Sequence, residues 1–303
     1  MDISGVLIID KSAGITSRKV CDRVSEITGV KKVGHAGTLD PMAVGVLIVL
    51  LGEATKIDPY LKNLEKEYVT SIVFGKKRDT GDKDGKIIEK DEEFNIIEKK
   101  VLEKVIKNFI GEIYQRPHPY SAVKYKGKAL HKYARAGERI VMPPRKVFIK
   151  SIDILGVEDN RGFLKVVNSK GVYIRSLAED IAEKIGTYAY LDQLVRIRVG
   201  DFTKEKALTL DKLQKIADEN LLKKHIISPV EALNMQKIII SNSDRKKVLQ
   251  GVPIGNFISS EYLYEIENNK KFAIISENKN NLYAIVEKDE KGKIGYLRVF
   301  KNS

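Results

Sequence analysis

Apolar residues recur along this chain in short runs, in alternation with polar residues, and at the spacing of a helix. The runs and alternations predict strands at residues 5–9, 45–51, 67–74, 146–155, 163–167 and 191–199. The helical spacing predicts helices at residues 17–27, 54–64, 96–110 and 173–185, with Ser17 as a cap and Gly29, Gly111 and Gly186 as stops. Strands and helices do not alternate regularly, so the pattern predicts an α+β fold with a mixed, mostly antiparallel sheet.

The pattern changes near the end of the chain. Residues 208–233 combine helical spacing with many lysines and predict a bridging helix that Pro229 breaks. Strand patterns follow at residues 237–240, 271–275, 282–286 and 295–300, with one helix capped by Ser241 or Ser243. We therefore expect a large domain over residues 1–232 and a small β-rich domain over residues 233–303.

The composition is that of a globular protein. Hydrophobic residues make up 43% of the 303 positions, enough for a sizeable core. The apolar run at residues 45–51 is far shorter than the roughly 18–20 residues of a membrane span. The N-terminus shows no signal-peptide pattern, and the single cysteine, Cys21, has the spacing of a core residue. These features predict a cytoplasmic protein.

The charge is strongly positive and concentrated in one segment. The net charge of +13 favours a polyanionic partner, although a generally lysine-rich composition would give the same excess. Between residues 116 and 150 Glu138 is the only acid, and the basic residues there are Arg116, Lys124, Lys126, Lys128, Lys132, Arg135, Arg139, Arg145, Lys146 and Lys150. Tyr120, Tyr125 and Tyr133 are interleaved with them, a pattern typical of a surface that follows phosphates and stacks on bases. Prolines bracket this segment, so we expect a projecting loop-strand-helix unit.

Two segments could display carboxylates. Residues 78–85 hold three aspartates without the spacing of a calcium loop, so they predict a hairpin or loop. In the predicted loop at residues 33–42, Pro41 keeps Asp40 out of the helical region and presents its side chain as a nucleophile, base, metal ligand or turn cap. No histidine lies at metal-ligand spacing from His35, and no phosphate-loop ending is present. The residue types alone favour a structural turn aspartate.

Several motifs together resemble one enzyme family. Residues 34–45 (Gly-His-Ala-Gly-Thr-Leu-Asp-Pro-Met-Ala-Val-Gly) resemble the catalytic motif of the TruB-type pseudouridine synthases. Further resemblances to this family, in the same order, lie at residues 10–17, 66–68, 120–128, 133–137, 169–177 and 194–196, with Ser12 where the family usually has proline. The C-terminal residues resemble the small RNA-binding PUA domain. The resemblance implies the central sheet of that family, with a basic thumb insertion at about residues 116–145.

The resemblance also implies chemistry. These enzymes convert one uridine of the tRNA T arm (position 55) to pseudouridine, so Asp40 would be the nucleophile or base and Arg175 would pair with it. Tyr68 would stack on the flipped uracil and transfer a proton, Tyr173 and Leu194 would line the base pocket, and His35 would hold the T loop. The thumb residues Lys124, Lys126, Lys128, Lys132 and Arg135 would bind RNA. The reaction needs no cofactor, nucleotide or metal, and we expect a monomer with tRNA as its partner and no obligate protein partner.

Alternatives stay open. Tyr68 or Leu194 taken alone is more typical of a core residue, and Arg175 stands four residues before Glu179, the spacing of an ordinary helix ion pair. Guide-RNA-dependent synthases share the aspartate motif but lack the long basic thumb. A tRNA-folding chaperone without chemistry would also need a basic surface, but it would not need Asp40, Tyr68 and Arg175.

Overall fold

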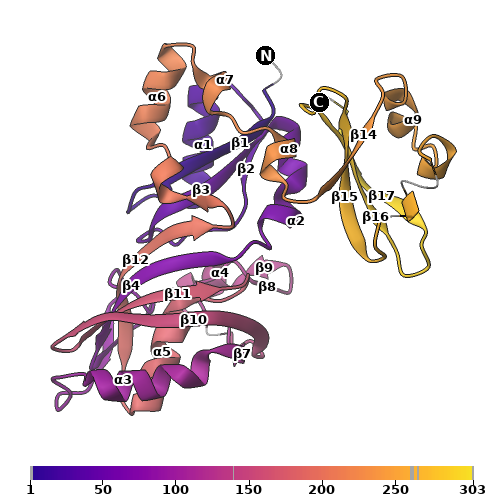
Figure 1. Cartoon of the computed structure of the whole chain (residues 1–303). Coiled ribbons are helices and arrows are strands. Elements are labelled where there is room, and N and C mark those ends of the chain that lie inside the picture. Colours follow the sequence, from indigo (N-terminus) through magenta and orange to yellow (C-terminus); the bar gives the residue numbers. More distant parts are fainter. Residues whose placement is uncertain (1–2, 139, 260–262, 265, 302–303) are drawn as a thin grey trace.

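The computed structural model describes residues 3–138, 140–259, 263–264 and 266–301, and its backbone runs through two sheets of different size (Figure 1). The strands of the large sheet are β1 (Gly5–Lys11), β2 (Val33–His35), β3 (Val44–Leu51), β4 (Lys66–Phe74), β7 (Gly111–Gln115), β10 (Arg145–Glu158), β11 (Arg161–Asn168), β12 (Ala189–Val199) and β13 (Phe202–Thr203). Their order is β1-β3-β12-β4-β11-β10-β7, with β2 beside β3 and β13 beside β12. Only the β3–β12 pairing is parallel, which confirms the predicted mixed, mostly antiparallel sheet.

Four helices cover one face of this sheet. α1 (Ser17–Thr28) and α6 (Leu210–Asp218) lie over its upper half, while α3 (Lys99–Ile106) and α5 (Ile174–Ile185) lie over its lower half (Figure 1). One apolar cluster runs along this face and joins Leu7 of β1, Val20 of α1 and Leu177 of α5. Since side chains alternate along a strand, the neighbouring residues of β1 point to the opposite face.

Residues of that opposite face share a second apolar core with the C-terminal unit. Its strands are β14 (Gln236–Ile240), β15 (Lys270–Ser276), β16 (Leu282–Lys288) and β17 (Ile294–Val299), paired in that order, with α9 (Arg245–Leu249) and the 3-10 turn η4 (Ile254–Asn256) beside them. A second apolar cluster joins Ile48 of β3 with Ile275 of β15 and Leu282 of β16. β3 is therefore buried on both faces, which explains its unbroken apolar run.

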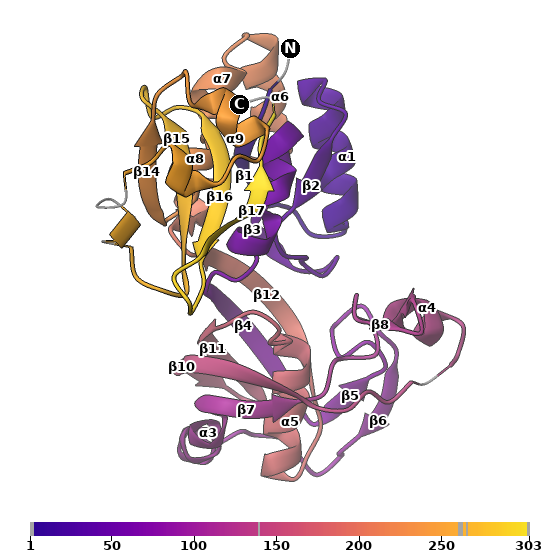
Figure 2. The same cartoon turned by 90° about the vertical axis from the view of Figure 1, so that its right-hand side faces the viewer.

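Two smaller hairpins extend from the lower half. β5 (Lys76–Arg78) pairs with β6 (Ile87–Lys90), which confirms the hairpin expected around residues 78–85. β8 (Lys124–Tyr125) pairs with β9 (Lys128–Ala129) and is followed by α4 (Leu130–Arg135). Figure 2 shows β8 and α4 standing off from the main sheet near β5 and β6, so the expected projecting unit is present as a hairpin and a helix.

Several predicted boundaries need correction at the N-terminal side of the chain. Thr16, not Ser17, caps α1, because the Ser17 hydroxyl binds Leu39 instead. The helix expected at residues 54–64 is a 3-10 turn, η1 (Gly52–Ile57), followed by the single turn α2 (Asp58–Leu61) with Pro59 near its start. The loop expected at residues 33–42 begins with β2, where pairing with β3 outweighs the high glycine content.

Other corrections concern the middle and the bridge. The helix expected at residues 96–110 is shorter, comprising α3 and the 3-10 turn η2 (Lys107–Phe109), and Gly111 opens β7. The bridge contains α6, α7 (Leu222–His225) and α8 (Pro229–Ala232), and η3 (Lys204–Lys206) precedes it. Pro229 begins α8 rather than breaking a helix, because the first turn needs no donor from that residue. Asp244, not Ser241 or Ser243, holds the N-cap position of α9 without a side-chain cap bond, and Ser241 Oγ accepts its backbone N–H at 3.2 Å.

Candidate active site

The motif aspartate meets an arginine from another part of the chain. Arg175, in the first turn of α5, donates through Nη2 to Asp40 Oδ1 at 2.8 Å. The Arg175 side chain is 3% exposed, whereas that of Asp40 is 28% exposed. The buried guanidinium of Arg175 thus binds the carboxylate of Asp40, which is partly exposed and can be contacted by a substrate. The predicted pairing of Arg175 with Asp40 is confirmed.

The guanidinium of Arg175 has further partners that orient it. Nη2 donates to the Tyr120 carbonyl at 2.9 Å, and Nη1 donates to the Thr80 carbonyl at 2.8 Å. Asp82 lies 3.7 Å from Nη1 and is a second carboxylate beside the same guanidinium. Glu179 lies instead 3.8 Å from His118 Nε2, so Arg175 is not in an ordinary helix ion pair with it. The sequence motifs do not mark Asp82 or His118 as site residues; the available signal is that a polar side chain buried beside Arg175 requires a polar partner.

Asp82 belongs to the acidic loop between β5 and β6. Its Oδ1 accepts from Thr80 Oγ1 at 2.7 Å and from the Asp84 backbone N–H at 3.2 Å. Asp79 accepts from the Lys86 backbone N–H at 2.8 Å. These carboxylates are used within the loop, and no cluster of three acidic, histidine or cysteine side chains suited to a metal occurs in the described residues.

Three buried polar side chains hold the backbone of the motif loop. Lys11 Nζ donates to the Pro41 carbonyl at 3.0 Å. The Ser17 hydroxyl donates to the Leu39 carbonyl at 3.0 Å and accepts from its N–H at 2.9 Å. Arg196 is fully buried and donates to the carbonyls of Val46 (2.7 Å), Gly37 (3.1 Å) and Thr38 (3.3 Å).

In the sequence, Lys11, Ser17 and Arg196 are recognisable only as members of the family motifs at residues 10–17 and 194–196. The available signal is a charged residue within an apolar strand pattern, because a buried charge must find hydrogen-bond partners. Burial lowers the pKa of Lys11 to about 8, against the opposing effect of Asp40. Gly45 completes this arrangement, since a Cβ there would lie 2.2 Å from the Arg196 carbonyl oxygen and its φ is +101°.

The expected base-pocket residues lie around this loop. Tyr68 of β4 and Leu194 of β12 come from adjacent strands, are 7% and 6% exposed, and share an apolar cluster with Leu39 of the motif. Tyr173 is the residue that precedes α5. Burial raises the pKa of Tyr173, the neighbouring Ser121 hydroxyl opposes that shift, and the charge of Asp40 adds to it. The phenol of Tyr173 is therefore neutral and close to Asp40.

His35 lies at the entry to the motif. It is the last residue of β2, opposite Val49, and its Nδ1 is buried without a partner among the described residues. Burial lowers the pKa of His35, an effect that nearby Asp58 opposes. The ring of His35 is therefore neutral in the folded protein.

The basic thumb side chains are exposed, but its tyrosines are engaged with each other. The exposed set is Lys124, Lys126, Lys128, Lys132 and Arg135. The rings of Tyr125 and Tyr133 meet edge to face at 6.0 Å, and Lys128 Nζ lies 4.3 Å from the centroid of Tyr133. These contacts stabilise the thumb internally, while both rings remain partly exposed.

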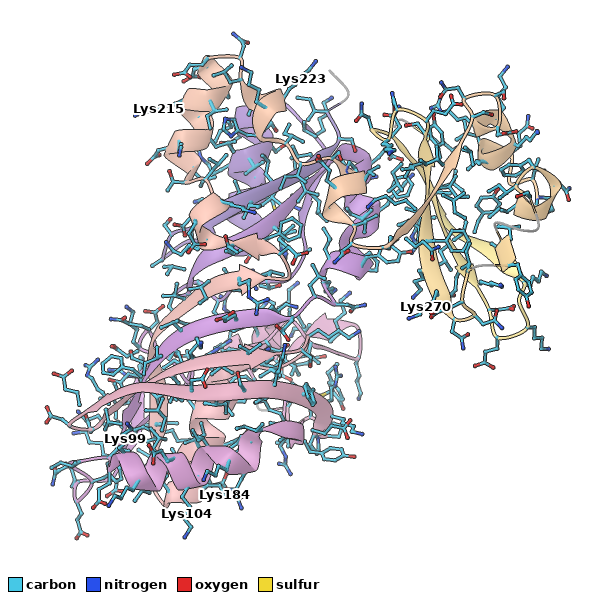
Figure 3. The ribbon with its side chains drawn as sticks, in the orientation of Figure 1. Lys99, Lys104, Lys184, Lys215, Lys223 and Lys270 are labelled. Carbon is cyan, nitrogen blue, oxygen red and sulfur yellow. The ribbon has the colours of Figure 1, made fainter. Side chains whose placement is uncertain are left out.

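Positive charge is not confined to the thumb. Lysines also stand out from α3, α5, α6, α7 and β15 (Figure 3). The figure labels Lys99, Lys104, Lys184, Lys215, Lys223 and Lys270. The generally lysine-rich composition therefore contributes to the net charge. No helix in the described part of the chain has the length and apolarity needed to cross a membrane.

Comparisons with known proteins agree with this geometry. Residues 25–174 match the N-terminal domain of the TruB family of pseudouridylate synthases, and residues 175–234 match the C-terminal domain of tRNA pseudouridylate synthase B. The tRNA pseudouridine synthase B of Clostridium perfringens strain 13 is 39% identical over 96% of this chain and 97% of its own length. That of Psychrobacter arcticus is 35% identical over 91% of this chain and 76% of its own.

Solved structures extend the likeness to the fold. A chain of a Cbf5-Nop10-Gar1 complex superposes with a TM-score of 0.71 at 27% identity, covering 98% of this chain and 84% of its own. A chain of an H/ACA RNP bound to a substrate RNA containing 2'-deoxyuridine superposes with a TM-score of 0.73 at 24% identity, covering 98% and 85%. With family models spanning most of its length and an aspartate-arginine pair at the family's motif, this chain belongs to the TruB family of pseudouridylate synthases.

Proposed function

We propose that this enzyme isomerises uridine 55 in the T arm of tRNA to pseudouridine, with Asp40 as the catalytic carboxylate. The observation that carries the proposal is the Arg175–Asp40 ion pair at 2.8 Å, on the motif loop of a family whose members are named tRNA pseudouridine synthase B. The arginine fixes one oxygen of this carboxylate and leaves the other oxygen for the substrate.

The reaction breaks the bond from the ribose to N1 of uracil and forms one to C5, so no atoms are gained or lost. Asp40 either attacks the sugar or base covalently or removes a proton from the ribose, and both routes use one carboxylate. Tyr68 stacks on the flipped uracil, which must leave its helical stack to be reached, and also serves in proton transfer. Tyr173 and Leu194 line the base pocket, and His35 holds the T loop.

RNA binding falls to two basic regions in this proposal. The thumb insertion, residues 116–145, grips the T arm through Lys124, Lys126, Lys128, Lys132 and Arg135. Residues 233–303 form a PUA-like RNA-binding domain beside the catalytic domain at residues 1–232. The protein acts as a monomer in the cytoplasm and needs no protein partner.

Purified protein and a tRNA transcript, without any guide RNA, test the proposal directly. Chemical mapping of pseudouridine should show conversion at position 55. Conversion only when a guide RNA and partner proteins are added would place the enzyme with the guide-dependent synthases. Tight tRNA binding with no pseudouridine under any condition would indicate a tRNA-folding protein instead.

A further inference from the structure

The segment that leads into the thumb is fastened along the catalytic helix α5. We define residues 115–121 as the thumb root. Gln115 accepts the Tyr173 backbone N–H at 2.8 Å and donates to its carbonyl at 3.2 Å. The next carbonyl, of Arg116, accepts from the Ser176 hydroxyl at 3.1 Å. Figure 2 shows α5 between β7, where the root begins, and the projecting β8 and α4. The root therefore follows the helix that presents Arg175.

His118 lies in the middle of the thumb root and is 3% exposed. Its Nδ1 accepts the backbone N–H of Tyr120 at 3.2 Å, and Nη1 of Arg175 lies 3.2 Å from the same nitrogen. An arginine can only donate, so both neighbours of Nδ1 are donors. This network assigns the ring the tautomer with its proton on Nε2 and excludes a proton on Nδ1.

The other edge of the ring is also enclosed. Nε2 lies 3.8 Å from Glu179 Oε1, one turn after Arg175 on α5. Gly81, with φ +70°, covers this contact, and a Cβ there would lie 2.7 Å from Nε2. The ring is thus held by α5, by the loop after β5 and by its own segment. A side chain at position 81 would therefore collide with the ring.

We propose that His118 is a positioning residue for the reaction: its Nδ1 fixes the Arg175 guanidinium on Asp40 and ties that ion pair to the root of the thumb. His118 contacts no reacting atom itself, and it acts only through Arg175. Tyr120 shows the linkage, because its N–H binds His118 while its carbonyl binds Nη2 of Arg175. This role rests on the proposed pseudouridine synthase activity.

Two substitutions distinguish the effect of the hydrogen-bond acceptor at Nδ1 from the effect of the volume of the His118 ring. His118→Asn places an oxygen acceptor near the position of Nδ1, while His118→Leu fills similar space without one. Single-turnover conversion of a tRNA transcript by excess enzyme measures the chemical step, and filter binding measures tRNA affinity. We expect His118→Leu to slow conversion about tenfold or more while changing affinity by less than about threefold, since small errors in positioning act on the transition state. His118→Asn should recover to within about threefold of wild type.

The matched control is His225→Leu in α7, an exposed histidine outside the site, which should convert tRNA like wild type. The role is refuted if His118→Leu converts tRNA within twofold of wild type, or if His118→Asn is as slow as His118→Leu. Equal loss of tRNA binding and of thermal stability in both variants would show a purely structural residue. A wild-type enzyme that makes no pseudouridine would instead reject the proposed function, so the two failures are distinguishable.

Discussion

Arg175 Nη2 lies 2.8 Å from Asp40 Oδ1, although 135 positions of the sequence separate the two residues. The motif loop presents the carboxylate, and the first turn of α5 brings the cation to it. Neither segment forms the pair alone, so the active site exists only when β2, β3 and α5 are packed together.

Replacing Asp40 tests its role in chemistry. Asp40→Asn keeps the size and the hydrogen-bonding edge of the side chain but removes its charge, so pseudouridine formation should fall below detection. The transcript affinity should stay within a few-fold of wild type, because the thumb and the C-terminal unit are untouched. Mapping and filter binding on the same preparation provide the check. A parallel loss of binding would show that Asp40 is structural.

Replacing Arg175 tests the geometry of the pair. Arg175→Lys keeps the charge but cannot reach Asp40, Thr80 and Tyr120 together, because an ammonium lacks the planar fork. We expect single-turnover conversion to fall about 100-fold, as when preorganised donors are lost from an active site. Lys184→Arg, at the exposed end of the same helix, should have no effect. Near-normal conversion by Arg175→Lys would show that charge alone suffices.

Two arginines two residues apart on β12 make a matched stability test. Arg196→Met removes the donors to three carbonyls, of which that of Val46 is buried and those of Gly37 and Thr38 are partly buried, and a buried group left without a partner costs about 1–3 kcal/mol. Arg198 pairs with Glu65 and Glu67 at a partly exposed site, so Arg198→Met should cost about 1 kcal/mol or less. Urea unfolding measures both. Equal losses of unfolding free energy in the two variants would contradict the assigned role of Arg196 in holding the motif loop.

A half-buried carboxyl on α5, that of Asp180, predicts a pH dependence of stability. Burial, reinforced by Glu179 and Glu183, raises the pKa of Asp180 from 3.8 to about 6. Between these values the folded state binds more protons than the unfolded state, so this group's contribution to stability falls as the pH rises. Well above pH 6 the carboxyl is charged in both states, and its burial then lowers the free energy of unfolding by the full amount.

Asp180→Asn removes that penalty. The free energy of unfolding should rise by about 2 kcal/mol at pH 7.5, and the gain should shrink towards zero near pH 4. Urea unfolding at the two pH values gives the difference. Glu183→Gln, an exposed neighbour on α5, should change stability by less than about 0.5 kcal/mol at either pH. A gain for Asp180→Asn that is independent of pH would contradict the buried-carboxyl explanation.

Local patterns were sufficient for most elements and for the order of the site motifs. The strands at β1, β3 and β4 and the ends of α1 and α5 follow from apolar spacing and from Gly29 and Gly186, whose left-handed conformation stops each helix. The motif resemblance predicted that Arg175 pairs with Asp40. Predicted element boundaries were wrong where a residue distant in sequence forms the contact. The Ser17 hydroxyl, for example, binds the backbone of Leu39, and Thr16 caps α1 instead.

The sequence by itself determined most element types and the α+β class, because these depend on residues within a few positions of each other, and its motif resemblance pointed to Asp40 as the candidate carboxylate. Only the tertiary structure decided which buried cations support the loop, where the thumb root docks and which face of β3 shares a core with the C-terminal unit. Those contacts join residues such as Arg196 and Val46, which are 150 positions apart. They are selected by the packing of whole strands and helices and by the need to satisfy buried charges, which no local pattern contains.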